Sequence, residues 1–548
     1  MTKAVLNRNI LFIKAVLLVC EHRHFSLDFA SHGCPNKFRI SSTMNSSFKY
    51  VSILAVASTL ATSFLCAQED RPNVLFISVD DLNDWVGVYG GHPQAKTPHI
   101  DRFAQHAMVF RNASCPGPVC GPSRSALLSG FMPSTTGLYG NSNNMLDSAI
   151  VQKSATLPEY FSKHGYVTIS KGKIFHKHST ENGQDHGHWA FDIWEVAKGG
   201  GKIDPERYFC RDEGIISGQK IENPKFTNSG GSRLAFGPLL GEKEQTKDYR
   251  TAKWFEAKLK EDYEKPFFMA VGISKPHLPF YAPEEYFDLH PLESVIVPEY
   301  RMDDLDDILN THGAAAFKPH VDFQWCREYG VMRDAVQAYL ATVSYADECV
   351  GVVLDALANS RYADNTIVVI WGDHGWHFGE KLKFRKASLW REATQLPLII
   401  QTPNMQTGQD CRRNVNLIDL YPTLIDLCGL PEKELDGTTI RPLLENPNLA
   451  WPPTITTQGK GNHSIISERW HYTSYARGVE ELYDLENDPM QWTNLIHSDL
   501  DRAEVAIAEL KTYLPAFEAE EILKSQKDDS IKEMDHTIKT RRDLRSLK

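Results

Sequence analysis

The chain has 548 residues, of which 42% are hydrophobic, and a formal net charge of −11. This hydrophobic fraction excludes a disordered protein, and the length predicts one large domain with a smaller companion, because a single core rarely grows beyond about 300 residues. The acidic balance argues against a nucleic-acid partner bound by a basic surface, so affinity for an anion must come from local clusters of Lys, Arg and His.

The first 67 residues have the pattern of a leader sequence. Met44 begins a short polar stretch, an apolar run follows over residues 51–65, and cleavage is plausible after Ala67. We therefore predict a signal peptide over residues 44–67, a secreted or periplasmic protein without a transmembrane segment after cleavage, and an upstream translation artefact over residues 1–43. A membrane anchor at 51–65 is the alternative.

Two continuous apolar runs, residues 73–79 and 366–371, predict strands that are buried on both faces. The first is followed by Asp80 and Asp81, and the second by Gly372, Asp373 and His374. Ligands of doubly wound sheets bind beyond the carboxyl ends of strands, so the two pairs are expected to meet. Three carboxylates in one small pocket need a cation, and a hard divalent ion is the natural choice. The alternative is that each aspartate caps a helix.

Residues 120–124 read Cys-Gly-Pro-Ser-Arg. Pro122 suits the first turn of a helix, so Cys120 should lie at a helix N-terminus, where free N–H groups and the helix dipole favour an anion. Arg124, about one turn further on, adds a cation with a fork of donors. The alternative is a buried cysteine before an ordinary helix.

Two more strand-like runs, residues 165–170 and 266–273, end close to basic side chains. The basic candidates are Lys173 and His176 after the first run, His277 after the second, and Lys386 beyond the acidic pair at 373. A single histidine after a strand is more often structural than catalytic. The presence of several basic residues beyond strand ends favours one shared site.

Together these motifs resemble the type I sulfatases of the alkaline phosphatase superfamily, and the run from Asp373 to Trp376 resembles the iduronate-2-sulfatase-like branch. The resemblance covers about residues 71–495. It implies that a formylglycine-generating enzyme oxidises Cys120 to Cα-formylglycine (3-oxoalanine), and that one Ca²⁺ ion is bound. The metal ligands implied are Asp80, Asp81, Cys120, Asp373 and His374. The catalytic residues implied are Cys120, Arg124, Lys173, His176, His277 and Lys386. His374 is the weakest ligand, because imidazole suits hard cations poorly.

The expected reaction follows from the aldehyde. Its hydrate has two hydroxyls: one attacks sulfur and expels the sugar alcohol, and the other then releases inorganic sulfate. The metal and Arg124 should orient and acidify the hydrate, while Lys173 and Lys386 bind sulfate oxygens. His277 is expected to be the general acid for the leaving alcohol, and His176 to assist the hydrate.

The fold predicted is α/β, with a large, mixed but mostly parallel sheet sandwiched by helices and a smaller C-terminal α+β subdomain. The catalytic domain should span residues 70–450, the subdomain 451–523 and a charged, solvated tail 524–548. Residues 200–241 are expected to be an insertion near the site. Seven cysteines follow the leader, and removing Cys120 leaves an even set that is compatible with disulfides.

The resemblance predicts a sulfated oligo- or polysaccharide substrate that contains uronate, such as a glycosaminoglycan or an algal polysaccharide. Candidate substrate-binding residues lie in the surrounding loops: Asn143, Asn144, Trp376, His377, Arg469 and His471. Two alternatives remain open. One is a phosphonate or phosphodiester hydrolase of the same superfamily, and the other is a secreted glycan-binding protein with a decayed active site.

Overall fold

The computed structural model describes residues 71–176, 187–227, 233–403, 405, 407–496, 500–522 and 541. The predicted leader regions, 1–43 and 44–67, lie outside these residues. Within the described ranges no helix combines the length and the apolar character needed to cross a bilayer.

An eight-stranded sheet forms the centre of the fold. In spatial order its strands are β16 (Gln409–Asn416), β2 (Met108–Ser114), β15 (Gln395–Gln401), β12 (Thr366–Gly372), β1 (Asn73–Val79), β10 (Phe267–Ile273), β3 (Val167–Gly172) and β4 (Ile193–Glu195). β15 is antiparallel to both of its neighbours, and the remaining pairs are parallel. The predicted mixed, mostly parallel sheet is therefore confirmed.

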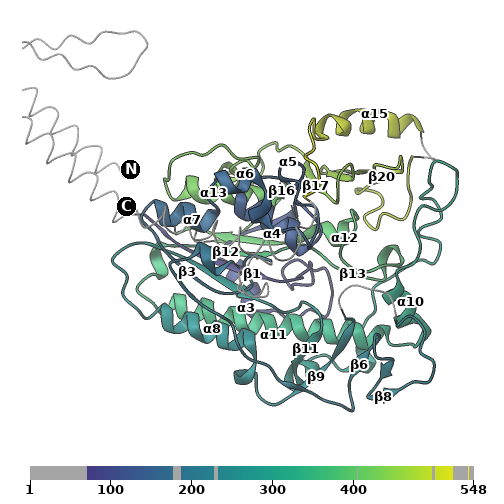
Figure 1. The fold of residues 1–548 in the computed structure, drawn as a ribbon, viewed down its shortest axis with the longest axis horizontal. Helices are drawn as coiled ribbons and strands as arrows, with labels where there is room; N and C mark the ends of the chain where they lie inside the picture. The colour runs from purple at the N-terminus through teal and green to yellow at the C-terminus, as the bar shows by residue number, and fades with distance from the viewer. Residues whose placement is uncertain are drawn as a thin grey trace, which may run out of the picture. The chain divides into compact units, whose positions relative to one another are not determined.

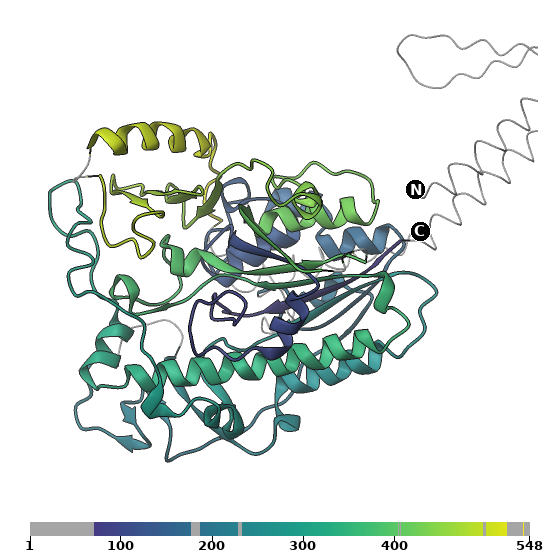
Figure 2. The same ribbon diagram turned by 180° about the vertical axis from the view of Figure 1, so that it is seen from behind.

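Helices cover both faces of this sheet (Figure 1 and Figure 2). Side chains of β1 alternate between two cores: Leu75 and Ile77 pack on one face, and Val74 and Phe76 on the other. One face is covered by α3 (Pro98–Ala104), α8 (Lys247–Lys258) and α11 (Met332–Ala358), and the other by α4 (Cys120–Ser129), α7 (Leu157–Lys163) and α13 (Leu420–Leu427). Burial of each large apolar side chain contributes roughly 1.5–3 kcal/mol, so the two cores hold the sheet rigidly.

The register of the parallel strands aligns their carboxyl ends. Val79 lies opposite Ile273 and opposite Gly372, and Gly272 lies opposite Gly172. The residues that directly follow these four strands are Asp80, Lys173, Ser274 and Asp373. Acidic and basic groups distant in sequence thus meet at one edge of the sheet, as ligands do in open α/β sheets.

Gly172 makes the closest of these approaches possible. Its φ is +88°, and a Cβ atom there would lie 1.9 Å from the carbonyl oxygen of Gly272. A side chain would force β3 and β10 apart, so the glycine keeps Lys173 at the same edge as the carboxylates.

Residues of the predicted insertion form a second, smaller sheet. Its strands are β5 (Lys202–Ile203), β6 (Phe209–Cys210), β7 (Ile215–Ile216), β8 (Gln219–Lys220) and β9 (Ala235–Leu240), joined to β11 (Phe280–Pro283). Since β11 follows shortly after His277, the insertion packs beside the carboxyl end of β10. The shorter elements of the large domain are α5 (Pro133–Thr136), α6 (Ala149–Lys153), α9 (Glu284–Asp288), α10 (Val321–Glu328), α12 (Arg391–Thr394), α14 (Arg441–Glu445), β13 (His377–Phe378) and β14 (Phe384–Arg385).

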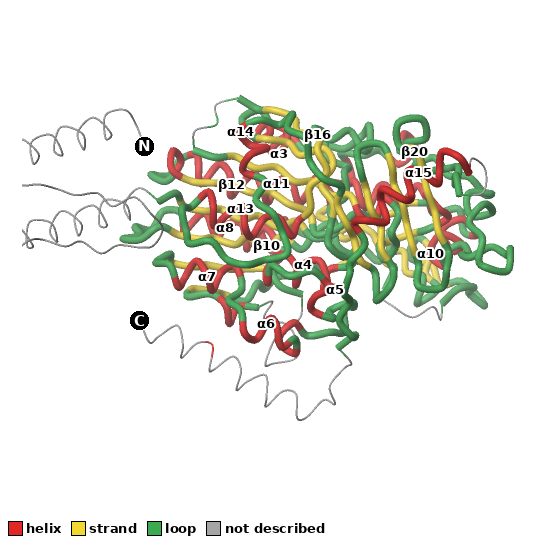
Figure 3. The backbone as a smooth tube through the Cα atoms, turned by 90° about the horizontal axis from the view of Figure 1, so that it is seen from above, coloured by secondary structure: helices red, strands yellow, loops and turns green. Residues whose placement is uncertain are grey.

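The C-terminal part is a four-stranded antiparallel sheet with one helix. The strands are β17 (Thr454–Thr457), β18 (His463–Ile466), β19 (Trp470–Ser474) and β20 (Glu480–Asp484), and α15 (Leu500–Leu510) packs on them through Ala503, Ala506 and Leu510. Figure 3 shows α15 and β20 together, at the end of the large sheet away from α7. This confirms the predicted smaller α+β unit.

One residue of the predicted tail, Arg541, is described, and it is buried. Arg541 is 8% exposed, lies 2.5 Å from the Glu159 carboxylate and donates to the carbonyl of Ser154 at 2.8 Å. The other residues of 524–548 are outside the described ranges. The seven described cysteines are all buried free thiols, so none of them forms a disulfide.

Candidate active site

Helix α4 begins at Cys120, as the sequence predicts, and the Cys120 side chain is fully buried. Its Sγ lies 3.0 Å from Lys386 Nζ, 3.3 Å from His374 Nε2, 3.6 Å from Lys173 Nζ and 3.7 Å from Asp81 Oδ1. The thiol stands where the oxygens of an aldehyde hydrate would be after oxidation. A nucleophile at this position is surrounded by cations and by the partial charges of a helix N-terminus.

These neighbours change the acidity of the site. Burial alone raises the pKa of the Cys120 thiol, but Lys173, Lys386 and His374 together lower its pKa well below the usual value. Burial likewise raises the pKa of Asp80, yet the Lys173 ammonium holds the pKa of that carboxyl well below its usual range. An anion at residue 120 is therefore stabilised by its surroundings.

Arg124 holds two of the carboxylates in place. Its Nη2 lies 2.9 Å from Asp80 Oδ1, its Nε lies 2.8 Å from Asp373 Oδ2, and its Nη1 donates to the carbonyls of Lys173 and Ile174. The guanidinium is fully buried. Loss of one partner of such a buried pair typically costs 3–5 kcal/mol. Arg124 thus positions the carboxylates, and its Nε, Nη1 and Nη2 groups donate to acceptors within the protein.

The oxygen atoms fit a hard cation. Ligand atoms of Asp81, Cys120, Asp373 and His374 lie within 4.8 Å of one another, as do those of Asp80, Asp81 and His277. Asp81 Oδ2 is buried and has no hydrogen-bond partner. A buried carboxylate oxygen without a partner is costly, and a divalent cation would remove that cost.

The backbone at Asp81 supports this arrangement. Its φ is 62°, a strained value for a residue with a side chain, and its N–H donates to Asp373 Oδ1 at 2.9 Å. The same carboxylate of Asp373 that pairs with Arg124 therefore holds Asp81 in its conformation. Backbone strain that is held by surrounding contacts is typical of functional sites.

His374 presents one ring nitrogen to the carboxylates. Nδ1 lies 3.0 Å from the carbonyl of Gly375, which can only accept, so Nδ1 carries a hydrogen. Nε2 then faces Asp81 Oδ1 at 3.2 Å and Asp373 Oδ1 at 3.6 Å. A histidine that donates through one nitrogen to a carbonyl is oriented as metal-bound histidines are.

The remaining basic residues surround the same point. Lys173 Nζ lies 2.5 Å from Asp80 Oδ2, and His176 interacts with the side chain of Cys120. His277 is 27% exposed, its Nε2 is 3.8 Å from Asp81 Oδ2, and its Nδ1 donates to the carbonyl of Leu278 at 2.6 Å. His277 is thus on the open side of the site. The structure brings together all the residues that the sequence assigned to catalysis and to the metal.

The structure corrects several predicted substrate contacts. His377 and His471 are 0% exposed, and their rings hydrogen-bond to Ser388 and to Ser464 and Gln491, respectively. The other two buried candidates are Asn143, which donates to the carbonyl of Ile522, and Trp376, which packs against Phe280 and Tyr339. These four side chains are held by partners within the protein, so the structure gives them structural roles and shows none of them open to a sugar.

Asn144 and Arg469 are more accessible. Asn144 accepts from the backbone N–H of Leu146 and so caps a turn. Arg469 is 45% exposed and lies 3.0 Å from Asp484. Both keep structural partners, and Arg469 retains an exposed cation.

Comparison with known proteins decides the family. Residues 72–430 match the family model described as Sulfatase, and residues 372–520 match the one described as N-sulphoglucosamine sulphohydrolase, C-terminal. The chain belongs to the sulfatase family. Sulfatases are sulfuric ester hydrolases, and membership implies a metal cation and a formylglycine in general.

Two curated relatives agree with this assignment. The chain is 37% identical over 432 residues to a sulfatase of Formosa agariphila, a match that covers 78% of this chain and 83% of the relative. It is 31% identical over 417 residues to the iduronate 2-sulfatase of Mus musculus, covering 66% of this sulfatase and 69% of the mouse protein.

Solved structures show the same fold at low identity. A phosphonate monoester hydrolase of Agrobacterium radiobacter superposes with a TM-score of 0.61 at 20% identity, over 81% of this sulfatase and 94% of that chain. A second solved structure shows a protein in complex with its substrate D-glucosamine-2-N,6-O-disulfate. It superposes with a TM-score of 0.59 at 19% identity, over 86% of this sulfatase and 98% of that chain. The alkaline phosphatase-like fold of this sulfatase is therefore established.

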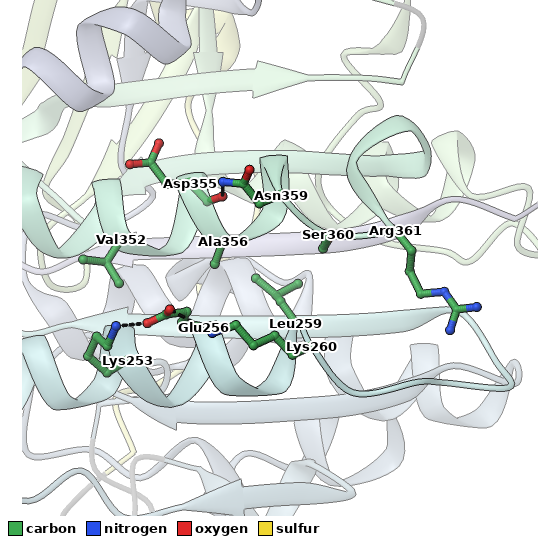
Figure 4. A pocket seen from close by; sticks show the side chains of 10 residues that line it. All are labelled: Lys253, Glu256, Leu259, Lys260, Val352, Asp355, Ala356, Asn359, Ser360 and Arg361. Atoms are coloured by element: carbon green, nitrogen blue, oxygen red, sulfur yellow. Dashed lines mark hydrogen bonds and ion pairs between the residues drawn. The ribbon is translucent and has the colours of Figure 1, made fainter.

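A surface groove between α8 and α11 is separate from this site (Figure 4). It is lined by helix side chains such as Lys253, Glu256 and Asp355, and Lys253 pairs with Glu256. None of the residues that surround Cys120 lines the groove. The groove is therefore distinct from the candidate active site at the strand ends.

Proposed function

We propose that this sulfatase is secreted or periplasmic and hydrolyses a sulfate ester on a uronate-containing polysaccharide, using a formylglycine made from Cys120 and one bound Ca²⁺ ion. The observation that carries the proposal is the position of the Cys120 side chain, at a helix N-terminus and within 3.0–3.7 Å of Lys386, His374, Lys173 and Asp81. The signal-peptide pattern at 44–67 supports the location.

The charge balance favours an anionic substrate. Three carboxylates, Asp80, Asp81 and Asp373, face three permanent cations, Arg124, Lys173 and Lys386. Because these charges cancel, a bound divalent cation leaves the site with two positive charges. That surplus stabilises the sulfate ester and the negative charge that grows on its oxygens.

When formed, the aldehyde hydrate at residue 120 supplies the oxygen that attacks sulfur. Asp81, Asp373 and His374 would hold the cation, with Asp80 completing the set. Lys173 and Lys386 hold sulfate oxygens in line with the nucleophile, and Arg124 keeps the carboxylates in register. His277, the most open of these groups, gives a proton to the departing sugar alcohol, and His176 takes part on the side of residue 120.

Peptide mass spectrometry tests the nucleophile. Protein produced in a host with a formylglycine-generating enzyme should contain formylglycine at residue 120 and release sulfate from an aryl sulfate. Fully active enzyme that retains an unmodified thiol would refute this nucleophile.

Named relatives support the substrate class. The mouse relative is an iduronate 2-sulfatase, and a 26% identical relative of Formosa agariphila is an ulvan-active sulfatase. We expect free sulfate from sulfated, uronate-containing oligosaccharides. Release from neutral sulfated galactans alone would refute the substrate, and faster hydrolysis of an aryl phosphonate monoester than of the matched sulfate would favour the phosphonate alternative.

A further inference from the structure

The segment that delivers Lys386 to the active site carries four cations within six residues: Lys381, Lys383, Arg385 and Lys386. Three of them pair with buried carboxylates: Lys381 with Asp304, Arg385 with Asp322 and Lys386 with Asp81. Among the residues that the structure describes, none forms a hydrogen bond or an ion pair with the ammonium of Lys383. Within the described part of the chain, Lys383 is thus a half-buried basic side chain without a direct hydrogen-bond or ion-pair partner.

Asp322 is the centre of a cluster next to this lysine. The Asp322 carboxylate is fully buried and pairs with both Arg211 and Arg385, and His320 Nδ1 lies 3.8 Å from it. Arg211 also lies 2.6 Å from Asp212. The two carboxylates therefore pair with two guanidiniums, and Lys383 is a third basic side chain in the cluster without a carboxylate of its own.

The cluster also has unused hydrogen-bond donors. Arg211 Nε and Arg385 Nη2 are buried and have no acceptor. A buried guanidinium N–H without an acceptor is destabilising, and native structures rarely keep such groups without a reason. An oxyanion bound beside Arg385 would supply an acceptor for its guanidinium and a partner for Lys383.

Three members of the cluster are reachable from outside. The side chains of His320 and Arg385 are 30% and 13% exposed, and Lys383 is half-buried, whereas Arg211 and Asp322 lie beneath them at 1% and 0%. Burial lowers the pKa of Lys383 to about 8, against the opposing effect of Asp322. Arg385 has a φ of 73°, a strained backbone that its ion pair to Asp322 holds.

We propose that Lys383, Arg385 and His320 form a subsite for a second anionic group of the glycan, separate from the group being hydrolysed. Arg385 directly precedes Lys386, so their Cα atoms are about 3.8 Å apart, and one strained turn serves both anions. The group bound is a carboxylate or a second sulfate of a neighbouring sugar. The inference deepens the proposed function and rests on it.

Lys383→Gln is the sharpest test, because this ammonium has no partner whose loss would unfold the protein. Lys260→Gln, in the exposed turn that follows α8, removes the same charge elsewhere and is the control. The substrates are 4-nitrophenyl sulfate, a monosulfated uronate disaccharide, its carboxyl-reduced form, and the reduced form with a second sulfate. For the substrate that carries the recognised anion, Lys383→Gln should lower kcat/KM about tenfold, mainly through KM. Hydrolysis of the aryl sulfate should not change.

The four substrates distinguish the possible outcomes. A loss on the uronate disaccharide alone identifies a carboxylate subsite, and a loss on the disulfated form identifies a sulfate subsite. Equal kcat/KM of Lys383→Gln and wild type on every glycan, or an equal loss on the aryl sulfate, overturns the subsite. If the wild type releases sulfate from none of them, the proposed function fails, and the Kd values of the same glycans, measured by calorimetry on both proteins, still decide the subsite.

Discussion

Two regions of this sulfatase bury titratable groups with opposite results. At the strand ends, neighbouring charges keep buried groups ionised: the pKa of Asp80 is lowered despite burial, and the pKa of Lys386 is raised, against burial, by Asp81. In the C-terminal unit, burial shifts groups towards their neutral forms: the pKa of His471 falls to about 4, and the pKa of Glu481 rises. Burial favours the neutral form unless opposite charges offset it.

The difference separates a reaction centre from a scaffold. His471 lies between the Ser464 hydroxyl and the Gln491 amide, and Glu481 accepts from the Trp390 indole at 2.8 Å. The contact of Glu481 joins the C-terminal sheet to the large domain, whereas those of His471 lie within the C-terminal unit. Changes at the strand ends should therefore remove activity from a folded protein, whereas changes in the C-terminal unit should remove stability.

Cys120→Ala should give the largest loss. Without the side chain that becomes the nucleophile, the rate of sulfate release should fall by about 10⁶-fold, the scale seen when an enzyme loses its nucleophile. Stopped assays of free sulfate measure it, with thermal unfolding to show that the protein folds. Cys428→Ala, which removes another buried thiol, should keep wild-type activity. Equal activities of the two variants would contradict the assignment.

Asp81→Asn should rank second, because it keeps the shape of the side chain and removes one charge from the candidate metal site. We expect kcat to fall by about 10⁴-fold, and chelated wild-type protein to behave alike until calcium is restored. Calcium should raise the Tm of chelated wild type and leave that of Asp81→Asn unchanged, since binding stabilises only a folded state that holds the ion. Asp419→Asn, at a buried cap of α13, should respond to calcium as wild type does. A rise in the Tm of Asp81→Asn on adding calcium, equal to that of wild type, would refute this metal site.

In His277→Gln, the loss of activity should depend on the leaving group of the substrate. A general acid contributes most when the departing alcohol is a poor leaving group, so the rate on a sugar sulfate should fall by about 10³-fold and the rate on 4-nitrophenyl sulfate far less. The ratio of the two kcat/KM values measures the effect. His290→Gln, a buried histidine paired with Ser344, should leave that ratio unchanged. An equal loss on both substrates would show that His277 does not act as the acid.

Residue patterns within a single short segment were sufficient to predict local structure. Apolar runs that end in acidic or basic residues located the strand ends, and the proline near Cys120 located the start of α4. Helix α13 begins only at Leu420, because β16 runs to Asn416 and the Asn416 side chain then caps a turn.

Contacts between distant segments could not be predicted in this way. Residue spacing around Arg385 gives no sign of its partner, the carboxylate of Asp322, which lies 63 residues away. Likewise, nothing around His377 or His471 in the sequence shows that each is sealed inside the fold. Exposure and pairing depend on tertiary packing, which residue spacing does not encode.

His471 provides the test with the smallest expected effect, and it concerns stability. The folded-state pKa of about 4 lies below that of an unfolded histidine, about 6.5, so the unfolded chain binds the proton first. The free energy of unfolding should then fall as pH drops from about 6.5 to about 4, by at most about 3 kcal/mol for this group. His188, His290 and His320, whose pKa burial also lowers to about 4, add to the same slope. His471→Gln should therefore show a shallower decline in urea midpoint over that pH range than wild type, with unchanged kcat at neutral pH. His312→Gln, at an exposed position, should keep the wild-type slope. If His471→Gln kept that slope as well and lost kcat instead, the division between a charged reaction centre and a neutral scaffold would be wrong at this residue.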